Sequence, residues 1–209
     1  MKTSGSALRI LATSLCFCGT LAGQASAGDN NWYAGVALGQ SKADLPSAAA
    51  WDAELATGGV TSASTLDDKD TAFGLFVGRS FSKNLAVELS YADFGEVGYT
   101  SNITVPALGT LKVPFEGTSW GVSLVGSLPL NERFSLQAKL GYQFWDAKAS
   151  VTVGGTTIDA GSDNGSDLMY GLGVKYEIND KFAVRAFWDR YKFDDTDTDF
   201  YGIGVQVGF

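Results

Sequence analysis

The sequence contains no histidine, and its two cysteines, Cys16 and Cys18, both lie close to the N-terminus. Histidine is the commonest general base in enzymes, and histidine and cysteine are the usual ligands of transition metals. Their scarcity argues against an enzyme, a metal site or a bound cofactor. Long apolar runs are missing too, since the run over 10–21 is shorter than the ~20 residues that a membrane-spanning helix needs.

The N-terminal segment has the pattern of a secretory signal peptide. Two basic residues precede the apolar run, and Ala-Ser-Ala at 25–27 matches an A-x-A cleavage site. We therefore expect a signal peptide over 1–27 and a single domain over 28–209. Both cysteines fall in the removed segment, so the mature chain is expected to contain no disulfide. The cleavage also shifts the net charge from −8 to −10, which argues against a nucleic-acid partner.

The rest of the chain shows apolar residues with a period of two and no sustained helical period. This alternation predicts eight strands, at 32–41, 70–81, 85–94, 116–128, 133–146, 167–178, 182–193 and 199–209. A short helix is expected over 46–59, within the first long connection.

The connections alternate between short and long. Three are tight, at 82–84, 129–132 and 179–181. Three of the other four are long and rich in Gly, Ser, Thr, Asp and Ala, over 42–69, 95–115 and 147–166; the fourth is 194–198. In an up-and-down meander this places the tight turns at one end and the loops at the other, as in outer-membrane barrels.

One face of each predicted strand is apolar and the other is mostly Gly, Ser, Gln and Ala. A soluble barrel would bury the apolar face, whereas a membrane barrel would present it to lipid. Large apolar side chains would overfill an eight-stranded interior, and aromatic residues gather near the strand ends, as expected at membrane interfaces. The sequence therefore predicts an all-β, eight-stranded antiparallel up-and-down transmembrane β-barrel. The expected interface aromatics are Trp32, Phe81, Tyr91, Trp120, Phe134, Tyr142, Tyr170, Phe182 and Trp188.

Several stretches resemble the OmpA-type outer-membrane β-barrels: NWYAGVALGQS, NLAVELSYADFG, VKYEINDKFAVRAFWDRY and the terminal GIGVQVGF. The resemblance implies a monomeric barrel in the outer membrane, with a structural role and at most a narrow, gated pore. It also implies that the barrel-assembly machinery recognises the terminal strand, in which Tyr201 and Phe209 are the expected assembly signal. Many relatives carry a further domain that binds peptidoglycan, and tethering of this kind is not expected here.

Strand parity directs six ionisable side chains to the barrel interior: Glu88, Lys139, Lys175, Glu177, Arg185 and Asp189. Buried charges are costly unless they are paired, so we expect Glu88 to pair with Arg185 or Lys139. In the family, interior salt bridges block the lumen. The set here is either the gate of a small pore or a static ionic core.

Most acidic residues fall in the predicted loops. The expected partners are outer-membrane lipid and, through cation-mediated contacts, the phosphates of lipopolysaccharide. Loops are common sites of function, so an adhesin or surface receptor that acts through its loops is the alternative to a structural role.

Overall fold

The computed structural model describes residues 31–106, 109–194 and 196–209. The predicted signal peptide, 1–27, lies outside these residues. The elements are β1 (Trp32–Ala43), α2 (Ala48–Thr57), β2 (Thr61–Asp67), β3 (Lys69–Ser82), β4 (Leu85–Val105), β5 (Gly109–Pro129), β6 (Phe134–Val153), β7 (Thr156–Glu177), β8 (Phe182–Phe193) and β9 (Thr196–Gly208).

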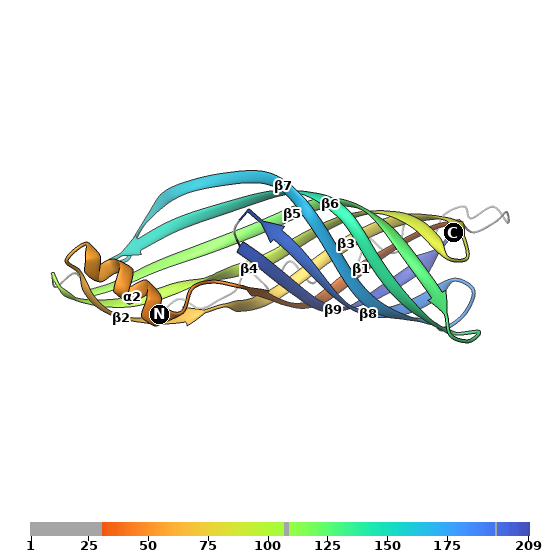
Figure 1. The fold of residues 1–209 in the computed structure, drawn as a ribbon, viewed down its shortest axis with the longest axis horizontal. Helices are drawn as coiled ribbons and strands as arrows, with labels where there is room; N and C mark the ends of the chain where they lie inside the picture. The colour runs from red at the N-terminus through yellow and green to blue at the C-terminus, as the bar shows by residue number, and fades with distance from the viewer. Residues whose placement is uncertain (1–30, 107–108, 195) are drawn as a thin grey trace. The chain divides into compact units, whose positions relative to one another are not determined.

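Eight of the strands in the described residues close into an antiparallel ring (Figure 1). The strands follow one another around it in chain order, from β1 through β3, β4, β5, β6, β7 and β8 to β9. The first and last strands pair from Tyr33 opposite Gly208 to Ala43 opposite Thr198, which joins the ends of the sheet. Closure gives each of the eight strands two neighbours in the ring, whereas the far part of β7, from Thr156 to Leu168, pairs with β6 alone. The predicted barrel is confirmed.

Two of the tight turns are built in the same way. In the turn between β5 and β6, the side chain of Asn131 accepts hydrogen bonds from the backbone N–H groups of Arg133 and Phe134, both at 2.9 Å. In the turn between β7 and β8, Asn179 accepts from Lys181 and Phe182 at the same distance. An asparagine that bonds to its own turn fixes the chain reversal at low cost.

The predicted ends of several strands are wrong. The segments 95–115 and 147–166 were expected to be loops, but they extend β4 with β5 and β6 with β7 as long hairpins. The second hairpin reverses through Gly154 and Gly155, which have φ of 58° and 85°. Positive φ at both central residues is the requirement of the type I′ hairpin turn, and glycine meets it without strain.

The first long connection contains the predicted short helix, α2, and the unpredicted strand β2, which pairs with the far part of β4. Figure 1 shows α2 beside β2. Ser47 caps the helix by accepting a hydrogen bond from the backbone N–H of Ala50. Trp51 stacks on Tyr99 with ring centroids 4.6 Å apart, so the tryptophan anchors the helix to β4.

Asp52 in α2 accepts hydrogen bonds from the hydroxyl groups of Ser62 and Ser64 in β2. These bonds favour the charged carboxylate, so they hold the pKa of Asp52 below its ordinary value of 3.8. This contact ties the helix to its neighbouring strand.

The outer surface of the ring is apolar over the middle of every strand. Leu140 and Ile203, for example, are 61% and 63% exposed. All nine aromatic residues predicted for the membrane interfaces lie on this outer surface, where Tyr91 and Trp120 are adjacent with centroids 4.9 Å apart. Among the described residues, no helix is long and apolar enough to cross a membrane.

The barrel interior holds more large side chains than an inward face of mostly Gly, Ser, Gln and Ala would provide. Large side chains that the sequence analysis passed over point inward and lie opposite glycines on the neighbouring strand. Tyr33 pairs with Gly78, and Phe76 pairs with Gly35. Because the glycine has no side chain, the aromatic ring can lie flat across it. A Cβ at Gly78 would run into the ring of Tyr33.

Candidate functional site

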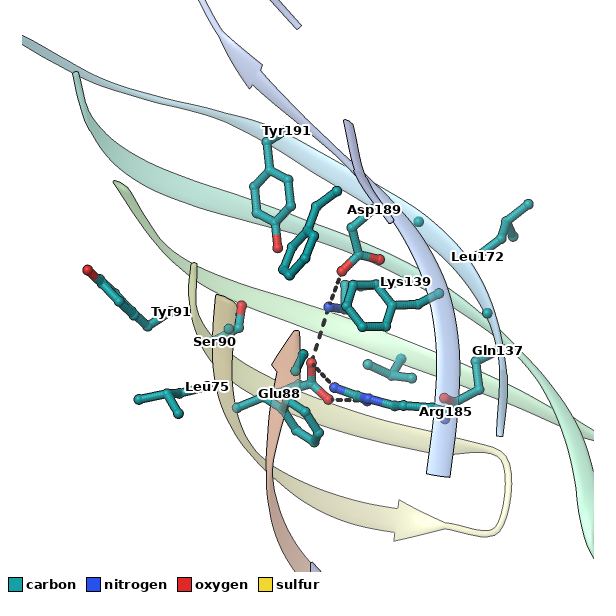
Figure 2. A pocket seen from close by; sticks show the side chains of 18 residues that line it. Leu75, Glu88, Ser90, Tyr91, Gln137, Lys139, Leu172, Arg185, Asp189 and Tyr191 are labelled. Carbon is teal, nitrogen blue, oxygen red and sulfur yellow. Dashed lines mark hydrogen bonds and ion pairs between the residues drawn. The ribbon is translucent and has the colours of Figure 1, made fainter. Parts of the chain in front are cut away.

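The candidate site is a set of four charged side chains from three strands in the barrel interior. Glu88 comes from β4, Lys139 from β6, and Arg185 and Asp189 from β8. Each has the inward parity of its strand, and Figure 2 shows the four pointing toward one another. Leu75 and Leu172, which have the opposite parity, point away.

The four side chains form one continuous chain of ion pairs. Asp189 Oδ2 lies 2.7 Å from Lys139 Nζ, which in turn lies 3.2 Å from Glu88 Oε1. The other oxygen of Glu88, Oε2, accepts from Arg185 Nη1 at 2.8 Å, and Arg185 Nη2 donates to Oε1 at 3.2 Å. Glu88 therefore pairs with both cations that the sequence offered as alternatives. Two acids and two bases make the set neutral.

This set, here called the charged layer, is deeply buried. Glu88 has no exposed surface, and Arg185 and Asp189 are 6% and 4% exposed. Tyr33 donates a hydrogen bond to Glu88 Oε2 at 3.2 Å, and the Arg185 guanidinium lies 3.5 Å from the centre of the Phe76 ring. A cation over an aromatic face is attracted by the ring's quadrupole, so aromatic side chains support both ends of the Glu88–Arg185 pair.

Lys175 and Glu177, also predicted for the interior network, do not join the charged layer. They form a separate ion pair, Nζ to Oε1 at 2.8 Å, and Glu177 is far more exposed than the buried set. Both residues lie close to the turn that ends β7. Parity alone gives the direction of a side chain, whereas its height in the barrel depends on its position along the strand.

A second layer of packed side chains lies toward the loop end of the lumen. The ring of Phe94 meets the rings of Tyr191, Phe193 and Phe200 at centroid distances of 4.8, 5.4 and 6.3 Å. Trp145 packs on Phe193. This aromatic layer joins β4, β6, β8 and β9 across the interior. The sequence analysis missed it, although inward parity on these strands was available as a signal.

Among the described residues, two cavities of about 40 Å³ each lie in the barrel. The first is lined by the charged layer and by Tyr191 and Phe200 of the aromatic layer. The second lies nearer the tight turns and is lined by Tyr33, Lys83 and Lys175 among others. Each has room for roughly three water molecules, at about 10–15 Å³ for each water centre. Among the described residues, no group of acids could hold a metal ion.

The predicted assembly signal lies on and after the closing strand. Tyr201 in β9 is paired opposite Trp188 in β8, and both rings lie on the outer surface. Phe209 directly follows β9 and is 49% exposed. Recognition by an assembly factor needs accessible side chains, and both residues meet that condition.

Known proteins share this architecture. The profile of the family described as outer membrane protein beta-barrel domain matches residues 11–209. Outer membrane protein A of Salmonella typhi is 26% identical over 166 residues, which are 78% of this chain and 41% of that protein. The chain thus spans less than half the length of this relative.

Solved structures are similar as well. Neisserial surface protein A superposes with a TM-score of 0.50 and 16% identity, over 86% of this chain and 97% of that one. The N-terminal barrel domain of OprF from Pseudomonas aeruginosa gives a TM-score of 0.49 and 14% identity, over 86% and 98%. At 16% identity the likeness to Neisserial surface protein A shows the fold alone. The profile match over nearly the whole chain shows more: this protein belongs to the outer membrane protein β-barrel domain family and is a protein of the outer membrane.

Proposed function

We propose that this protein is a structural component of the outer membrane, a barrel whose lumen is closed to ions and solutes. The observation that carries the proposal is the buried chain of ion pairs from Asp189 through Lys139 and Glu88 to Arg185. An eight-stranded barrel has an interior just wide enough for its own side chains to fill, and here charged and aromatic side chains both cross it.

The charged layer and the aromatic layer lie one after the other along the lumen, and together they support a closed lumen better than the charged layer alone. A pore needs a continuous file of water, but the two cavities inside the barrel have volumes of only about 40 Å³ each. Phe94, Tyr191 and Phe200 are each at most 5% exposed, so the aromatic layer excludes water above the first cavity. A static core therefore accounts for the arrangement better than a gate that opens readily.

The proposed partners follow from the surface. The apolar outer face suits the hydrocarbon of the membrane, and the acidic loops suit cation-mediated contact with lipopolysaccharide phosphates. The barrel-assembly machinery is the proposed partner during insertion, with Tyr201 and Phe209 as the contact. We propose a monomer without catalytic activity, since the chain has no histidine to serve as a general base.

Cells of the source organism that lack the gene provide the test. A structural role predicts that these cells become more sensitive to detergents and bile salts, and that the wild-type gene restores resistance. The Glu96→Ala variant, altered at an exposed acid of β4, should restore it equally. Unchanged sensitivity of the deletion strain to detergents and bile salts would rule out the structural role.

A second candidate function, a surface receptor or adhesin, is favoured by one observation. The part of β7 from Thr156 to Leu168 pairs with β6 on one side, whereas β8 pairs only with the part that begins at Met169. The other edge of this segment is available for an added strand. Removing the far part of the hairpin, 147–166, which carries most of this edge, should abolish attachment to a surface ligand and leave detergent resistance intact. Attachment that survives the deletion would exclude this edge as the binding site.

A further inference from the structure

The second cavity lies at the tight-turn end of the lumen and differs from the first in its charge. Its polar lining comes from hydroxyl, amide and ammonium groups, including Ser82, Ser127, Gln137, Lys83 and Lys175. Within the described part of the chain, no carboxylate lines it. A small polar cavity whose charged groups are both cations favours an anion.

Several of these groups have hydrogen-bond donors to spare. Ser82 accepts a bond from the backbone N–H of Asn84, and Ser127 accepts one from Gln137 Nε2, both at 3.2 Å. A hydroxyl that already accepts still has its own proton to donate. The ammonium of Lys175 has three donors and uses one on Glu177. For Lys83, no ion pair occurs among the described residues.

The charges deeper in the barrel do not oppose an anion here. Glu88, the fully buried acid of the lumen, has its charge matched by Lys139 and Arg185. Glu177 lies outside the cavity lining and is paired with Lys175 at 2.8 Å. Arg185 is the cross-strand partner of Lys175, but its charge is matched by Glu88 and it does not line this cavity. The volume of about 40 Å³ corresponds to roughly three waters, which is comparable with one small oxyanion.

We propose that this cavity binds a phosphate group, either free inorganic phosphate or the phosphomonoester headgroup of a lipid. Lys83 provides the positive charge, Lys175 donates through the N–H groups that its pair with Glu177 leaves available, and the hydroxyls of Ser82 and Ser127 donate to the phosphate oxygens. Tight turns of outer-membrane barrels face the periplasm, so the site is open to anions from that compartment. Phosphate binding at this cavity does not depend on whether the lumen above the cavity conducts ions.

The test uses the folded protein in detergent micelles and follows inorganic phosphate by ³¹P NMR line broadening, with chloride at equal ionic strength as the reference. The wild type should broaden the signal saturably, and the Lys83→Gln/Lys175→Gln variant should bind at least tenfold more weakly. Lys181→Gln, an exposed lysine of a neighbouring turn that does not line the cavity, is the matched control and should bind as the wild type does.

Lys83→Gln alone keeps the Lys175–Glu177 ion pair and guards against loss of folding, and it should also weaken binding. Competition by short-chain phosphatidic acid assigns the site to a lipid headgroup, whereas lack of competition assigns it to free phosphate. Equal broadening by the wild type and the double variant, or equal weakening in Lys181→Gln, would overturn the proposal.

Discussion

Truncating Glu88 to alanine is the perturbation that the structure defines most sharply. The carboxylate is the centre of the charged layer, with Arg185 on both of its oxygens and Lys139 on Oε1. After truncation Lys139 keeps Asp189 at 2.7 Å, so the group left without a counter-charge is the Arg185 guanidinium. Within the part of the chain that the structure describes, its Nε has no hydrogen-bond partner.

The expected loss in the free energy of unfolding comes from the Arg185 guanidinium, which is left without a counter-charge. Removing one partner of a buried ion pair costs about 3–5 kcal/mol. Arg185 keeps its contact with Phe76, and the adjoining cavity of about 40 Å³ admits water. We therefore expect a loss of about 3 kcal/mol, at the lower end of that range. Asp189→Asn should cost less, about 1.5–3 kcal/mol for one hydrogen bond to a charged group, because Lys139 keeps Glu88.

The assay is urea unfolding of the protein folded in lipid vesicles, followed by tryptophan fluorescence and by the mobility shift of the folded barrel on gels. Glu96→Ala, at an exposed acid of the same strand, is the control and should leave the free energy of unfolding unchanged. The double variant Glu88→Ala/Arg185→Ala should lose less than the sum of the single changes. Full additivity, or a cost for Glu88→Ala below that of Asp189→Asn, would refute the reasoning.

Four further outcomes are expected. Gly78→Ala places a methyl group in the ring of Tyr33 and should lower the free energy of unfolding by about 1–3 kcal/mol, whereas Gly126→Ala, where the nearest atom is 3.8 Å away, should be tolerated. Ser64→Ala should raise the pKa of Asp52, measured by ¹³C NMR of the carboxyl group. Because the pKa of Asp52 is lower in the folded protein than its ordinary value of 3.8, the stabilisation by the contact between α2 and β2 is present above pH 3.8. It is lost as the pH falls through the pKa of Asp52 in the folded protein. An unchanged pKa in that variant would exclude the hydroxyl bond as the cause. Deleting Phe209 should reduce the amount of protein in the outer membrane, and unchanged levels would show that the terminal aromatic is dispensable. Glu88→Ala alone should leave the lumen closed by the aromatic layer, and only Glu88→Ala/Phe94→Ala should raise conductance in planar bilayers; an open single variant would show that the aromatic layer is no barrier.

The barrel itself could be predicted because alternation with period two is a local property of the chain. Strand ends were harder, since the far parts of β4, β5, β6 and β7 are rich in Gly, Ser, Thr and Asp and look like loops. The Gly154-Gly155 pair between two β-branched runs was the signal for a hairpin there. The composition of the whole segment, rich in Gly, Ser, Thr and Asp, is typical of a loop and conceals this turn signal.

The inward direction of the charged side chains could be predicted from the sequence, but the ion pairs that they form could not. Parity identifies Glu88 and Arg185 as inward, but which cation meets which acid depends on the register between strands, such as Val125 opposite Lys139. The same limit explains why Lys175 was grouped with the charged layer. The interior aromatics escaped because the inward face was judged by its average composition, in which glycines conceal the rings that lie across them, as Phe187 does opposite Gly202.

Planar-bilayer recording of the purified wild-type barrel tests the central claim most directly. The claim is that the charged layer and the aromatic layer together close the lumen. The account predicts no sustained ohmic steps at moderate voltage and neutral pH, while the Glu88→Ala/Phe94→Ala variant recorded in the same membrane conducts. Large, stable, ohmic conductance of the wild type would contradict it and would make the protein a pore.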